Sequence, residues 1–170
     1  MAFTSLCTAL ICLSSYFVIP LPMTAAVLSL QSLFISLTAL CLKKHNGVLS
    51  VVLYVFMGAV GLPVFSGGSS GLSKLLSPVG GYYFGFIIAA FLISHFKGNT
   101  SDLRQYLAVT VLIGIPAEHI TAVLFMSAVT SSSPVSSFMS ISLPFLAGDL
   151  IKAVAAAFIA VQINKSLIKA

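Results

Sequence analysis

The sequence predicts an all-α integral membrane protein: one domain over residues 1–170, built as a bundle of six transmembrane helices with both termini in the cytoplasm. Three observations predict this class. The 170-residue chain is 59% apolar and only 6% charged, whereas a soluble domain carries about a quarter charged residues. Apolar segments recur along the whole length, which allows roughly six spans of about 20 residues each. The net charge of +5 comes from scattered residues, and this scatter argues against a nucleic-acid partner.

The apolar segments locate the expected helices. In the bilayer core the backbone N–H and C=O groups find no water, so a spanning segment has to be helical. The runs are continuous rather than alternating, which excludes the strands of a membrane barrel. We expect spans over about 3–19, 25–42, 48–62, 80–96, 104–129 and 142–164.

The basic residues orient the predicted bundle. The loop after the second span carries Lys43 and Lys44, the loop after the fourth carries Lys97 and Arg104, and two more lysines close the chain. With an even number of spans these sites share one side, and only Lys74 stands in a loop on the other side. Because cytoplasmic loops are enriched in Lys and Arg, we expect the segment between the third and fourth spans to lie outside.

That external segment, residues 63–78, is rich in Gly and Ser. Its Gly-rich run superficially resembles a phosphate-binding loop, but Ser73 precedes Lys74 and Leu75 follows it. A P-loop needs Gly before the Lys and Ser or Thr after it, so we expect no nucleotide site. Apolar residues such as Phe65 favour a compact loop that folds back into the mouth of the bundle over a flexible linker.

The cysteines point to neither a metal nor a cofactor. Cys7, Cys12 and Cys41 lie in apolar segments. Their spacing fits no zinc or haem-attachment motif, and buried thiols behave as small hydrophobic groups.

Glu118 and His119, in the fifth predicted span, are the only residues that resemble acid–base chemistry. Neighbours on a helix point about 100° apart, and no nucleophile set accompanies them. We therefore expect interior hydrogen bonds rather than catalysis, and no enzyme. A proton relay and an intramembrane enzyme that uses this pair are the alternatives.

Asp149 and Lys152 are the most informative charges. They stand at i and i+3, on one face of the sixth span. Charges at membrane depth usually face the interior or a cavity, so the pair is either a ligand-binding site or an ion pair that locks the helix. Gln31 is either a ligand contact or a link between helices. Tyr82 is either an interfacial tyrosine or a stacking wall for a ligand.

Three motifs, in this order, resemble the BioY family, the biotin-specific substrate-capture (S) components of energy-coupling factor (ECF) transporters. They are residues 61–68 (GLPVFSGG), 77–86 (SPVGGYYFGF) and 144–152 (PFLAGDLIK). The resemblance covers residues from about 19 to 160. Val79 departs from it, because the family usually has Thr there.

The resemblance implies a bundle that captures biotin at its outer face and delivers it for ATP-driven uptake. It places the protein as a multi-pass component of a bacterial cytoplasmic (inner) membrane. Asp149 would accept hydrogen bonds from the ureido N–H groups, and Lys152 would donate to the ureido oxygen or neutralise a charge. The implied substrate-binding residues are Asp149, Lys152, Gln31, Tyr82, Phe65, Gly80 and Gly81.

The implied partners are a membrane coupling subunit and a pair of cytoplasmic ATPases. Such S components often dock through an Ala-x-x-x-Ala face on the first helix. Here Ser5 with Ala9, or Thr8 with Cys12, would take that role. The alternatives are an S component for a different vitamin and a structural membrane protein without a ligand.

Overall fold

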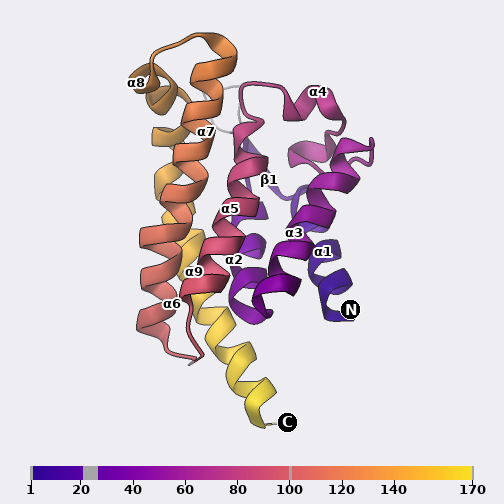
Figure 1. Cartoon of the computed structure of the whole chain (residues 1–170), viewed down its shortest axis with the longest axis vertical. Coiled ribbons are helices and arrows are strands. Elements are labelled where there is room, and N and C mark those ends of the chain that lie inside the picture. Colours follow the sequence, from indigo (N-terminus) through magenta and orange to yellow (C-terminus); the bar gives the residue numbers. More distant parts are fainter. Residues whose placement is uncertain (1, 21–26, 100, 170) are drawn as a thin grey trace.

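The computed structural model describes residues 2–20, 27–99 and 101–169, and these residues form a mostly helical bundle (Figure 1). The main helices are α1 (Ala2–Ser14), α2 (Gln31–Cys41), α3 (Lys44–Ala59), α5 (Gly81–Phe96), α6 (Leu103–Val109), α7 (Ile115–Thr130) and α9 (Leu143–Lys169). The short elements are strands β1 (Val18–Pro20) and β2 (Val27–Ser29), the 3₁₀ turn η1 (Ser66–Gly68), and helices α4 (Leu72–Leu75) and α8 (Pro134–Ser137). Two π-helical segments, η2 (Thr110–Gly114) and η3 (Phe138–Ser142), join α6 to α7 and α8 to α9.

The first two helices are shorter than predicted. Strands β1 and β2 pair antiparallel, with Val18 opposite Ser29, so the prediction of helix over 15–19 and 27–29 is wrong. The hairpin is closed by a hydrogen bond from Leu30 N to Phe17 O at 3.2 Å. Strand pairing satisfies the backbone groups in place of helical bonds, and the β-branched Val18 and Ile19 suit an extended chain. Residues 21–26, which include the predicted start of the second span, lie outside the described residues.

The later helices follow the predicted segments closely, with two earlier starts. The run α6–η2–α7 covers 103–130, against an expected 104–129. Helix α3 starts at Lys44 and α8 at Pro134, so the loops predicted there are shorter. At α8 the reason is local: the Ser133 side chain accepts a hydrogen bond from Ser136 N at 3.2 Å, and Pro134 occupies the first turn.

Two helical runs, Leu103–Thr130 and Pro134–Ser166, are long and apolar enough to cross a membrane. Figure 1 places α4 and the α7–α8 connection at one end of the molecule and both termini toward the other. Large apolar side chains such as Leu112 and Ile151, each 71% exposed, cover the outside of the bundle, as expected for a surface in contact with lipid.

Helix packing separates the two candidate docking pairs on α1. Thr8 is buried, and its hydroxyl donates to Thr4 O at 3.0 Å and Ser50 O at 3.1 Å. Ser5 and Ala9, by contrast, are exposed. Thr8 is therefore used inside the bundle, and the outward face of α1 carries Ser5 and Ala9.

Lys97 closes the C-terminal end of α2. Its ammonium donates to Ala39 O at 3.0 Å, to Leu40 O at 2.9 Å and to Leu42 O. These carbonyls have no partner within their own helix, so the lysine ties the end of α2 to the end of α5. Burial lowers the pKa of Lys97 to about 8.

Candidate ligand-binding site

A cavity of about 190 Å³ opens among β2, α2, α4, α5, α7 and α9. This volume is several times the roughly 30 Å³ that one water occupies in the liquid. The lining residues are Ser29, Ser32, Ser66, Gly67, Lys74, Val79, Tyr82, Tyr83, Phe86, Glu118, Phe145, Asp149 and Lys152. The wall therefore combines aromatic surface with hydroxyl groups and charges, the usual composition of a small-molecule site.

Asp149 and Lys152 form the predicted pair. Lys152 Nζ lies 2.5 Å from Asp149 Oδ1, and the side chains are 9% and 7% exposed, respectively. Lys152 also donates to Ser29 O at 2.9 Å, and Ser32 Oγ donates to Asp149 Oδ1 at 2.9 Å. The pair is thus anchored to the junction of β2 and α2, far away in the sequence.

The hydrogen-bonding capacity of the pair is not exhausted. An ammonium has three donors, and Lys152 uses two of them on Asp149 and Ser29. A carboxylate offers about four lone-pair positions, and Asp149 accepts from Ser32, Lys152 and His119. Among the described residues, one donor of Lys152 and one acceptor position of Asp149 are therefore unused, and both residues line the cavity.

His119 completes the support of Asp149. Its Nε2 lies 3.1 Å from Asp149 Oδ2, and its Nδ1 lies 3.2 Å from the Tyr82 hydroxyl. Tyr82 in turn donates to Ile141 O within η3. The interior hydrogen bond expected of His119 is therefore present, and it orients the carboxylate that faces the cavity.

Glu118 faces the cavity one position earlier on α7. It is 3% exposed, and no hydrogen-bond partner for its carboxyl is found among the described residues. The close approach of α5 to α7 at this point depends on Gly85, since a Cβ there would lie 2.9 Å from Glu118 O. Glu118 and His119 therefore both belong to the site. Glu118 lines the cavity, and His119 contacts Asp149 from behind the wall.

Aromatic rings form the apolar part of the wall. The Tyr82 ring packs edge-on to Phe145, with centroids 6.2 Å apart, and Phe86 and Tyr83 continue the surface. The predicted site residue Phe65 does not line the cavity and packs behind Tyr83. It is fully buried, and its ring centroid is 4.2 Å from that of Tyr83.

Gln31 also acts from behind the wall. Its amide nitrogen donates to Tyr54 OH at 2.6 Å and Val64 O at 3.2 Å. Its amide oxygen accepts from Ser66 Oγ at 2.6 Å and Ser29 Oγ at 3.1 Å. All four positions of the amide are used by the protein, so Gln31 positions two serines that line the cavity.

Gly80 and Gly81 serve packing in the structure. A Cβ at Gly80 would lie 1.8 Å from Leu75 O, and one at Gly81 would lie 2.8 Å from Ala122 Cα. Neither glycine lines the cavity. The first lets α4 sit against the start of α5, and the second lets α5 approach α7.

The loop 63–78 folds into the mouth of the bundle, as predicted. Gly67 N donates to Ser15 O at 2.9 Å and Gly71 N to Gly58 O at 2.8 Å. Gly67 and Gly71 have φ values of +71° and +92°, a region open to glycine. The loop contributes part of the cavity wall through η1 and α4.

Comparison with known proteins identifies the family. The family model of BioY matches residues 1–169. The chain belongs to the BioY family. It is 36% identical over 159 residues to the biotin transporter BioY of Thermotoga maritima, covering 93% of this chain and 91% of that protein. It is 33% identical to the probable biotin transporter BioY of Pyrococcus horikoshii, covering 85% and 82%.

A solved structure has the same fold. The crystal structure of the S-component for biotin from an ECF-type ABC transporter matches with a TM-score of 0.89 at 26% identity. The match covers 96% of this chain and 89% of that one. The mostly helical bundle with its hairpin is therefore the S-component fold.

Sequence reasoning missed several residues that line the cavity. Ser32, Ser66, Phe86 and Phe145 line the cavity but were not among the predicted site residues, although the last three lie within the motifs that resemble the family. Ser32 and Phe145 gave one usable signal, since each is close in sequence to a residue that was singled out. Lys74 was considered only as the lysine of a rejected phosphate-binding loop and as the one loop lysine on the outer side.

Proposed function

We propose that this BioY-family chain is a high-affinity biotin-binding S component that captures biotin at the outer face of the membrane and has no chemistry of its own. One observation carries the proposal: a cavity in which a buried donor–acceptor pair, Asp149 and Lys152, faces an aromatic wall. The names of the BioY relatives and of the matching S component support biotin as the ligand. They also favour transport over an enzyme based on Glu118 and His119.

The proposed fit follows from the capacity left on the pair. The ureido ring of biotin carries N–H donors beside one C=O acceptor. Asp149 accepts from a ureido N–H, and the third N–H of Lys152 donates to the ureido oxygen. The apolar thiophane ring packs against Tyr82 and Phe145. Gln31, Phe65, Gly80 and Gly81 contribute by holding the serines, Tyr83 and α4 in place.

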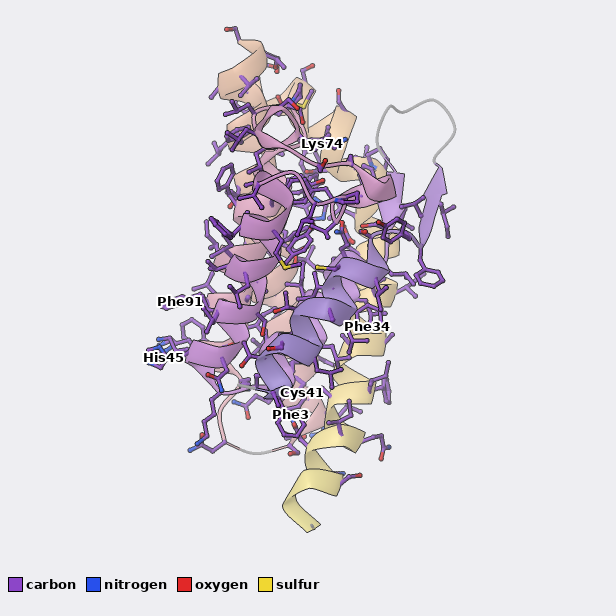
Figure 2. The ribbon with its side chains drawn as sticks, turned by 90° about the vertical axis from the view of Figure 1, so that its right-hand side faces the viewer. Phe3, Phe34, Cys41, His45, Lys74 and Phe91 are labelled. Atoms are coloured by element: carbon purple, nitrogen blue, oxygen red, sulfur yellow. The ribbon has the colours of Figure 1, made fainter. Side chains whose placement is uncertain are left out.

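The topology belongs to the proposal as well. We propose six spans, both termini in the cytoplasm, and a bacterial inner-membrane location. The basic residues support this orientation, because Lys97 and Arg104 flank the α5–α6 connection near the end that holds the termini. Lys74 lies at the opposite end from Phe3 and Cys41 (Figure 2).

A membrane coupling subunit and a cytoplasmic ATPase pair complete the proposed transporter. The outward face of α1, with Ser5 and Ala9, is the proposed docking face. Small side chains let a partner helix approach closely. The pair Thr8 and Cys12 suits this role less well, because Thr8 is buried against α3.

Equilibrium binding tests the proposal. Purified protein in detergent is titrated with biotin by calorimetry or by intrinsic tyrosine fluorescence, since the chain has no Trp. One-to-one binding with a nanomolar Kd is expected. Competition with other vitamins separates biotin from a different vitamin ligand, and folded, ligand-free protein that binds none of them would refute capture.

A further inference from the structure

Lys74 is a second cation in the cavity wall, and it comes from α4 rather than from the Asp149–Lys152 pair. It is partly exposed. No ion pair or side-chain hydrogen bond of its ammonium is found among the described residues. The cavity therefore presents a positive charge that the protein leaves without a counterion.

The acidic residues of the chain explain why this charge is unpaired. There are only three. Asp102 caps α6, at the opposite end of the bundle from α4 (Figure 1). Asp149 is already paired with Lys152 and supported by His119. Glu118 lines the same cavity but forms no ion pair with Lys74.

The position of Lys74 is built into the fold. Leu75 buries its side chain in the core at 6% exposure, while Leu72 and Leu76 are more than 60% exposed. Gly80 lets the start of α5 touch Leu75 O, where a Cβ would lie at 1.8 Å. Helix α4 is thereby seated on the bundle with Lys74 at the cavity.

We propose that Lys74 is the residue that binds the carboxylate of the ligand. The inference rests on the proposed function, because it assigns the anionic tail of biotin. Lys152 is already neutralised by Asp149 at 2.5 Å, so the second role considered for Lys152, neutralising a ligand charge, passes to Lys74. The site then binds both ends of its ligand. Asp149 and Lys152 bind the neutral ring with its donors and acceptor, and Lys74 binds the carboxylate.

The test compares biotin with biotin methyl ester, which keeps the ring and loses the charge. The proteins are wild type, Lys74→Met and Lys74→Arg, with Lys43→Met as the control that removes an exposed lysine outside the cavity. A charged hydrogen bond of ordinary strength predicts that the wild type prefers biotin by roughly 10- to 100-fold. Lys74→Met should lose this preference and bind the ester as the wild type does. Lys74→Arg and Lys43→Met should retain it.

Each other outcome has a definite meaning. Equal binding of biotin and ester by the wild type would overturn the assignment of Lys74 and leave biotin capture standing. A parallel loss of both ligands in Lys74→Met would show a structural role only, and a preserved preference would place the carboxylate elsewhere. A folded wild type that binds neither would overturn both the proposed function and this inference.

Discussion

Replacing Asp149 with Asn removes the charge at the centre of the site while keeping the size of the side chain. The carboxylate accepts from Ser32, Lys152 and His119, and Lys152 is buried. In Asp149→Asn the Lys152 ammonium is left buried without its counterion. Loss of a buried charged partner in a binding site costs about 2–5 kcal/mol, which is roughly a 30- to several-thousand-fold weaker affinity.

The same change is expected to destabilise the fold, because breaking a buried ion pair costs about 3–5 kcal/mol. The double variant Asp149→Asn/Lys152→Met separates the two effects. It removes the stranded charge, so its thermal unfolding temperature in detergent should return toward that of the wild type. Its affinity for biotin should stay low, since both ligand contacts are gone.

Calorimetric titration with biotin, alongside thermal unfolding of the same samples, measures both quantities. If folded Asp149→Asn binds biotin with wild-type affinity, the reasoning that Asp149 and Lys152 contact the ligand is refuted. Recovered binding in the double variant would refute it as well. An unfolding temperature that stays low in the double variant would show that the pair contributes to folding by more than charge balance.

Four further changes test the site and the packing of the bundle. Gln31→Leu removes four hydrogen bonds behind the cavity wall and should lower the affinity for biotin. It should also lower the free energy of unfolding by about 1–3 kcal/mol, which thermal unfolding measures. Gly58→Ala would place a Cβ 2.2 Å from the Phe65 ring, so it should destabilise the fold by about 1–3 kcal/mol through overpacking, and an unchanged unfolding temperature would contradict this. Glu118→Gln should change biotin affinity by less than about threefold, whereas an enzyme built on Glu118 would lose its turnover. Burial lowers the pKa of Lys97 from 10.5 to about 8, so the folded protein bears the cost of a buried charge below pH 8 and loses that cost as the pH rises to 10.5. The free energy of unfolding of the wild type should therefore increase between pH 8 and pH 10.5. Lys97→Met should not show this increase.

The helices were predictable from the sequence because long apolar runs leave the backbone one way to satisfy its hydrogen bonds in lipid. The hairpin was not, since β1 begins inside an apolar run, 3–19, that has the pattern of one continuous helix. The extended conformation of β1 depends on its pairing with β2, about ten residues further along the chain. The apolar content of a segment does not predict such pairing.

The site was predictable where its contacts are local. Asp149 and Lys152 lie one turn apart, so helix geometry alone predicted the pair. The links from Ser32 and His119 to Asp149 span 117 and 30 residues, and no local pattern announces them. Gln31 illustrates the limit: the sequence left open whether it touches a ligand or other helices, and only its four partners in the fold show that it holds the serines.

The loop that forms part of the cavity wall is fastened to the turn that directly follows α1. Gly67, which lines the cavity, donates to Ser15 O at 2.9 Å, and Tyr16 OH donates to Pro63 O at 2.7 Å. A displacement of α1 therefore pulls on the wall around the ligand. If the proposed coupling subunit moves α1 when it docks, docking and ligand binding share one coupling free energy, and each changes the affinity of the other by the same factor. In the proposed transporter, a protein with its cavity filled then presents a different α1 to its partner than an empty one does, so the filled and empty states differ at the docking face.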